Sequence, residues 1–174
     1  MANVDCPRGL YPVGHLTGGE IRTEEFIVTT SAAIYKGDIL EMVSGGTVDP
    51  AAATDGVKVI GVAAHNVTAA ASATAGTKIQ VYCDPYIIFG IQGVTGYTSS
   101  AATIGLSADA TTYAAGNTTS FLSATELDTP SAQTAMFHVL GLVASPDNAW
   151  GEHADLKVIF NEHRYKASAG AAGI

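Results

Sequence analysis

Short segments in which apolar and polar residues alternate recur along this 174-residue chain, and they limit its fold more than any other feature. In TKIQVYC, residues 77–83, odd-numbered side chains fall on one face of an extended chain and even-numbered ones on the other. Further candidate strands are residues 24–30, 33–43 with a tight turn at 36–38, 57–64, 86–92, 136–143 and 156–163. Of these, 136–143 is apolar on both faces, which predicts a central strand buried between two layers. The pattern predicts an all-β fold, a single compact domain resembling a barrel or a sandwich.

The segments between these strands are poor in helix-forming side chains. Two tracts, residues 65–77 and roughly 94–120, are rich in Thr, Ser, Ala and Gly and lack an apolar stripe at helical spacing. We therefore expect long loops or flat edge strands there. One helical turn is expected within 123–130, where Ser123 can cap its start and Pro130 ends it.

The first twenty residues differ from the rest because proline and glycine recur in them. Pro7, Pro12 and the glycines at 9, 14, 18 and 19 disfavour regular structure, so residues 1–20 are predicted to form an extended N-terminal arm. Residues 21–165 then form the β domain. Residues 166–174, which end in an Ala/Gly-rich run, are predicted to be a flexible C-terminal tail.

Charge and composition narrow the class of partner. The net charge of −8, with only eight scattered Lys and Arg residues, argues against binding to nucleic acid or to an anionic membrane. Apolar runs are too short to span a bilayer, and the start does not resemble a secretory signal, so a product of the cytoplasm is expected. In that compartment Cys6 and Cys83 are expected to be reduced, although pairing stays open.

The stretch SPDNAWGEHADLKVIFNEH, residues 145–163, concentrates carboxylates and imidazoles and is the first place to look for a metal or catalytic site. His153 and His163 are ten positions apart, too far along one straight strand for a single coordination sphere. HExxH, CxxC, GxSxG and GxGxxG motifs do not occur. His138 alternates with apolar neighbours, as a hydrogen-bonded core or interface histidine does. We therefore expect no enzyme, and no catalytic, cofactor-binding or metal site; residues 145–163 are predicted to be turns and a strand.

Five stretches of the chain resemble one group of virion proteins: NVDCPRGLYPVGHLTGGEIRT, AIYKGDIL, IGVAA, VYCDPYIIFGIQ and LVASPDNAWGEHADLKVIFNEH. They are similar to the capsid decoration proteins, also called cement or stabilisation proteins, of tailed bacteriophages. The resemblance covers nearly the whole chain and is least distinctive around residues 95–120. It implies a structural protein made in the host bacterial cytoplasm and located on the capsid exterior of the virion. There it would bind the major capsid protein of the expanded shell, bridge neighbouring subunits and form a homotrimer.

The arm and the closing turn are the expected contacts with that partner. Small side chains in an arm let backbones approach closely, and many weak contacts on a repeating lattice add up through avidity. The interface residues that we predict are Arg8, Leu10, Tyr11, His15 and Trp150. Two alternatives stay open: the arm folds back on its own β domain, and Trp150 packs in the core.

Three other functions are compatible with the sequence. A phage neck or tail structural component would have a similar composition. A secreted carbohydrate-binding or adhesin module would need an exposed aromatic platform, and this chain has one tryptophan. An enzyme of unrecognised type would depend on residues such as His153, His163 or Glu152.

Overall fold

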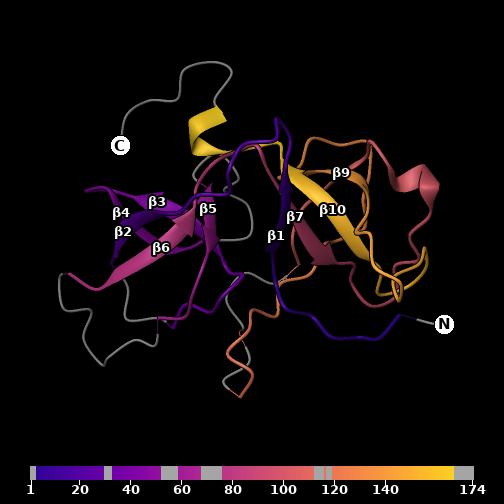
Figure 1. Ribbon diagram of the computed structural model, residues 1–174, viewed down its shortest axis with the longest axis horizontal. Helices are drawn as coiled ribbons and strands as arrows, with labels where there is room; N and C mark the ends of the chain where they lie inside the picture. The colour runs from indigo at the N-terminus through magenta and orange to yellow at the C-terminus, as the bar shows by residue number, and fades with distance from the viewer. Residues whose placement is uncertain are drawn as a thin grey trace.

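The computed structural model describes residues 3–29, 33–51, 59–67, 76–111, 116 and 119–166. Within them the chain forms two β units side by side, a closed barrel and an antiparallel sheet (Figure 1). The helical residues described are two short 3-10 turns, η2 (Ala101–Thr103) and η3 (Arg164–Lys166). The predicted all-β class is confirmed. Across the described ranges, no helix has the length and hydropathy needed to cross a membrane.

The barrel contains five strands that close on themselves. Its order is β2 (Glu24–Val28), β4 (Thr47–Pro50), β3 (Ile39–Val43), β5 (Val59–Ala63) and β6 (Lys78–Tyr82). Antiparallel pairing of β2 with β6 completes the closure. In β6 the alternation read from the sequence is realised, because Ile79 and Val81 are fully buried while Lys78 is exposed.

The second unit is a five-stranded sheet. Its order is β1 (Tyr11–His15), β7 (Ile87–Gln92), β10 (Asp155–Phe160), β9 (Phe137–Leu142) and β8 (Ser107–Ala108). The rings of Phe89, Phe137 and Phe160 pack on one face of it, with the Phe160 centroid 5.6 Å from that of Phe89 and 4.9 Å from that of Phe137. Every pairing in this sheet is antiparallel.

The strand that is buried on both faces is β5, not β9 as predicted. All five β5 residues are buried: Ile60 and Ala63 belong to the barrel core, whereas Val59 and Val62 join the core beneath the sheet. In β9 only every second residue is buried, and His138 and Leu140 stay partly exposed. Residues 136–143 are apolar on both faces, but this did not bury both faces of β9. The strand that lies between the two cores is β5, because of its place in the strand order.

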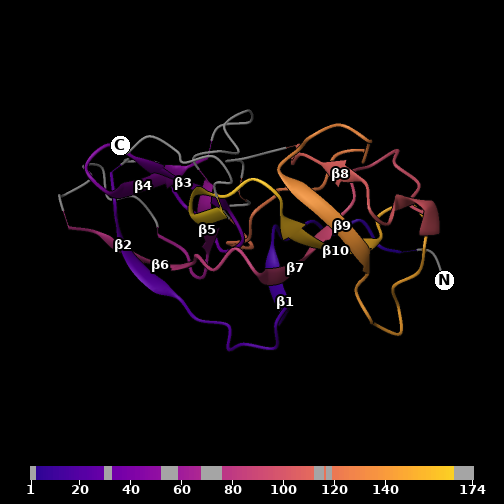
Figure 2. The same cartoon turned by 90° about the horizontal axis from the view of Figure 1, so that it is seen from above.

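The arm is more ordered than the sequence predicts. Residues 11–15 form β1, which pairs with β7 at the edge of the sheet, with a bulge between Pro12 and Gly14. Pro12 is compatible with this position because an edge strand has amide groups that need no partner. From β1 the chain crosses to the barrel through the exposed residues 16–23, seen as the long connection to β2 in Figure 2.

The structure also tests the predictions made for residues 123–130 and for the small-residue tracts. Residues 123–130 contain no helical turn, so that prediction is wrong: the Ser123 hydroxyl donates to Thr125 Oγ1 and accepts from its amide, while Leu127 forms bridges with Gly93 and Ala110. The tract 94–120 is loop with η2 and the short β8, as expected for its described part. Residues 68–75 of the first tract, and residues 167–174 of the tail, lie outside the described residues.

Candidate functional site

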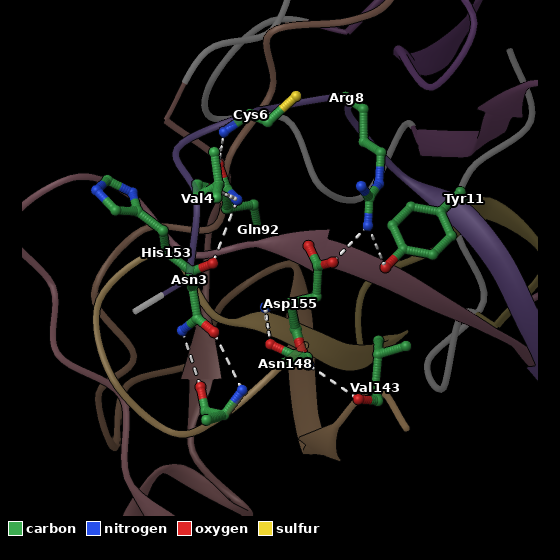
Figure 3. A network of polar contacts seen from close by, with 11 residues as sticks. Asn3, Val4, Cys6, Arg8, Tyr11, Gln92, Val143, Asn148, His153 and Asp155 are labelled. Carbon is green, nitrogen blue, oxygen red and sulfur yellow. Dashed lines mark hydrogen bonds and ion pairs between the residues drawn. The ribbon is translucent and has the colours of Figure 1, made fainter. Parts of the chain in front are cut away.

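The start of the arm, residues 3–10, lies against one end of the sheet (Figure 3). A cleft of about 450 Å³ lies beside it, and its lining includes Asn3, Val4 and Gln92. Gln92, the last residue of β7, is 4% exposed and holds the arm with its side-chain amide. Its Nε2 donates to the carbonyls of Val4 (2.9 Å) and His153 (3.2 Å), and its Oε1 accepts from the amide of Cys6 (2.9 Å). A buried amide satisfied three times fixes the chain around it, because breaking any of these bonds leaves a buried polar group unpaired.

Arg8 makes the second anchor of the arm. Its guanidinium donates to the Asp155 carboxylate at the start of β10 and to Tyr11 Oη (3.0 Å), and it lies 4.5 Å from the centre of the Tyr11 ring. The Asp155 side chain is 17% exposed, so this ion pair is shielded from solvent more than an ordinary surface pair. Burial raises the pKa of Tyr11, which keeps its hydroxyl protonated.

The turn between β9 and β10 completes the contact with the arm. Asn3 Nδ2 donates to the carbonyls of Ala149 (2.9 Å) and Glu152 (2.8 Å), and Asn3 Oδ1 accepts from the amide of Ala149 (3.1 Å). Asn148 closes the turn from inside by bonding the backbone of Val143 and Asp155. The closing turn and the beginning of the arm are thus one structural unit.

The five predicted interface residues fall in two groups: the four residues of the arm, which pack on their own chain, and Trp150, which is exposed. Arg8, Tyr11 and His15 contact this chain itself, and Leu10, 2% exposed, is part of the core. His15 Nε2 lies 3.0 Å from Asp84 Oδ2, and the His15 side chain is 7% exposed. In this fold, therefore, the arm folds back on its own domain, which was the open alternative.

Trp150, unlike the four arm residues, is exposed to solvent. It lies in the β9–β10 turn and is 36% exposed, so it is not a core residue. Val4, 76% exposed, lies on the arm segment that Asn3 binds to the same turn. Exposed apolar side chains are thus present on both segments at this end of the molecule, and their contact with a partner stays a prediction.

The two late histidines that drew attention in the sequence lie apart. His163 is 3% exposed, packs against Phe160 and Tyr165, and burial lowers its pKa to about 4. His153 lies in the β9–β10 turn beside the arm. They do not form one site.

His138 does have a hydrogen-bonding partner, as the sequence predicted. Its Nδ1 lies 2.8 Å from Ser107 Oγ, beside a cleft of about 480 Å³. Ser107 and His138 are directly paired in the register of β8 and β9, which by itself explains the contact. Among the hydrogen bonds and ion pairs of the described residues, none joins a carboxylate to this imidazole, as a catalytic triad requires.

A cluster that the sequence did not reveal is formed by Asp5, Glu126 and His153. One potential ligand atom of each lies within 4.8 Å of those of the other two, and His153 Nδ1 is 3.8 Å from Asp5 Oδ1. Burial, and then the Asp5 charge, raise the pKa of Glu126. The three residues come from the arm, the loop before β9 and the β9–β10 turn, so local spacing gives no signal for them.

Comparison of the chain with protein-family models, curated proteins and solved structures finds no match.

Proposed function

We propose that this protein is a structural component of a phage virion that binds the outer surface of the expanded icosahedral capsid and bridges neighbouring major capsid protein subunits. The observation that carries the proposal is the resemblance of several separate stretches to capsid decoration proteins. Its most distinctive pieces are PRGLYP (7–12), CDPYIIFGIQ (83–92) and PDNAWGEHADLKVIFNEH (146–163).

These three pieces are neighbours in the fold, so the residues that carry the resemblance form one structural unit. They contribute the adjacent strands β1, β7 and β10, and the ion pair of Arg8 with Asp155 joins the first piece to the third. Gln92, at the end of the second piece, bonds the arm and the turn that precedes β10.

The mechanism is thermodynamic. A ligand that binds the expanded shell and not its precursor stabilises the expanded state in proportion to its differential affinity. The net charge of −8 suits a protein outside the shell, which needs no affinity for packaged DNA. Val4, Val13, Leu16 and Trp150 provide exposed apolar area on the arm and the closing turn.

The deciding experiment adds the purified protein to expanded heads that lack it and to unexpanded precursors. We expect saturable binding to expanded heads only, in hundreds of copies, and a higher temperature of DNA release. A copy number of about a dozen, as in a single ring of subunits, would instead indicate a neck or tail component. If the protein does not bind heads but does bind glycans on an array, the proposal is wrong and the protein is an adhesin.

A matched pair of substitutions tests the closing turn. Trp150→Ala is expected to weaken head binding at least tenfold, because buried aromatic anchors dominate interfaces of this kind. Phe121→Ala removes another exposed aromatic side chain, 46% exposed, from the loop before β9, and is expected to bind normally. Thermal unfolding of both free variants separates a lost contact from a lost fold.

A further inference from the structure

The carboxylate–imidazole cluster of Asp5, Glu126 and His153 has the composition and the spacing of a metal site. One nitrogen and two carboxylate oxygens lie within 4.8 Å of one another, so a point exists roughly 2.8 Å or less from all three atoms. Zinc–ligand bonds are about 2.0–2.2 Å, so modest side-chain rotations complete the site. The Asp5 side chain is 56% exposed and is free to make such a rotation.

Two atoms of the cluster are shielded from solvent and have no hydrogen-bond partner: His153 Nδ1 and Glu126 Oε1. The His153 ring lies between two carboxylates, with Nδ1 3.8 Å from Asp5 Oδ1 and Nε2 3.9 Å from Glu152 Oε1. In the tautomer that carries its hydrogen on Nε2, the Nδ1 lone pair faces Asp5. A lone pair and two carboxylates turned toward one another repel, and a cation between them removes the repulsion.

Gln92 fixes the backbone around the cluster. Its amide bonds Val4 and Cys6, which flank Asp5, and the carbonyl of His153. Its backbone carbonyl accepts from the amide of Leu127, the residue after Glu126 (2.8 Å). One buried residue therefore fixes the backbone from which all three side chains extend, as the supporting residues of metal sites do.

We propose that Asp5, Glu126 and His153 bind one divalent transition-metal ion such as Zn²⁺, which clips the arm to the body of the protein. The imidazole favours Zn²⁺ over Mg²⁺ and Ca²⁺, which prefer sites made of oxygen alone. Water completes the coordination on the open side. The ion adds a direct link among three segments that the hydrogen bonds of Asn3 and Gln92 already hold together, so its effect is structural.

The test is a zinc titration of the full chain after chelator treatment, followed by calorimetry and by thermal unfolding. We expect one Zn²⁺ per chain and a higher melting temperature when zinc is present. Asp5→Asn and His153→Asn are expected to weaken binding at least tenfold and to remove the zinc-dependent rise. Asparagine is chosen at 153 because His153 has φ 55°, a left-handed conformation that asparagine tolerates.

Matched controls are Asp128→Asn and His65→Asn, which make the same changes at exposed positions outside the cluster. Both are expected to bind zinc as the parent does. Because Asp5 is exposed, Asp5→Asn stays a fair test even where His153→Asn fails to fold. A proton shared by the carboxylates is the competing explanation, and it predicts no zinc binding at up to about 1 mM. That result, or binding that Asp5→Asn leaves unchanged, would overturn the proposal.

Discussion

At the scale of the residue, His163 shows how burial sets a pH response. Its ring is enclosed by Phe160 and Tyr165, and its Nδ1 accepts the backbone amide of Tyr165 at 3.1 Å. Burial lowers the pKa of His163 from 6.5 to about 4. In the unfolded chain the imidazole gains a proton near pH 6.5, so between pH 6.5 and 4 the unfolded state binds more protons than the folded state.

This difference predicts that acid weakens the fold. The free energy of unfolding should fall as the pH drops from about 6.5 to 4, by up to about 1.4 kcal/mol per pH unit from this group. His163→Gln keeps a group that can donate and accept but cannot titrate, so it should flatten the slope. Urea unfolding at pH 7, 5.5 and 4.5 measures it, with the exposed His65→Gln as control. An unchanged slope in His163→Gln would refute the assignment.

At the scale of the element, β1 depends on a missing side chain in its neighbour. The Tyr11 ring lies over Gly90 of β7, where an added Cβ would be 2.4 Å from the ring carbon Cζ. Tyr11 and Gly90 are also directly paired in the register of the two strands. The glycine thus creates the groove in which Tyr11, and through it Arg8, is seated.

Gly90→Ala should therefore displace β1 and the arm. We expect a loss of about 1–3 kcal/mol in the free energy of unfolding, because the ring and β7 cannot both keep their positions. Gly14→Ala, in β1 itself, meets no atom within 4 Å and should be nearly neutral. Chemical denaturation gives both values, and amide hydrogen exchange of residues 3–15 reports the arm. Equal effects of the two substitutions would show that the Tyr11 contact is unimportant.

Elements with strong alternation were predictable, and those made by their neighbours were not. Seven predicted segments overlap β2, β3, β5, β6, β7, β9 and β10, although the strand predicted before the turn at 36–38 is reduced to isolated bridges of Ile34 and Lys36. The strands β1, β4 and β8 were missed because Pro12, Gly14 and Pro50 read locally as breaks, and β8 is only two residues long. Their extended conformation comes from pairing with β7, β3 and β9.

The candidate site was less predictable than the fold. Arg8 and Tyr11 were chosen from the arm, but their partner Asp155 lies 147 positions from Arg8. The cluster of Asp5, Glu126 and His153 joins three distant segments, and each residue alone looks like an ordinary surface side chain. Short-range spacing carries information about helices and strands, whereas sites assembled by tertiary contacts need the register of the sheet.

At the scale of the whole molecule, the barrel and the sheet share a core. Ile39 and Val62 of the barrel belong to the same buried cluster as Phe89 and Phe160 of the sheet. The second cluster lies inside the barrel and includes Ile60 of β5. Since β5 contributes to both clusters, neither unit can lose its structure without exposing apolar surface of the other.

The shared core predicts one cooperative unfolding transition. Ile79→Ala opens a cavity inside the barrel and should cost about 2–5 kcal/mol. Trp150, the single tryptophan, lies in the β9–β10 turn of the sheet and reports on the other unit. We therefore expect Trp150 fluorescence and far-ultraviolet circular dichroism to shift together in Ile79→Ala, and neither to shift in Ile104→Ala, a change at a residue that is 51% exposed. If the fluorescence transition stays at its original temperature while part of the dichroism signal is lost earlier, the two units fold independently. The arm and its proposed metal clip would then stabilise the sheet alone.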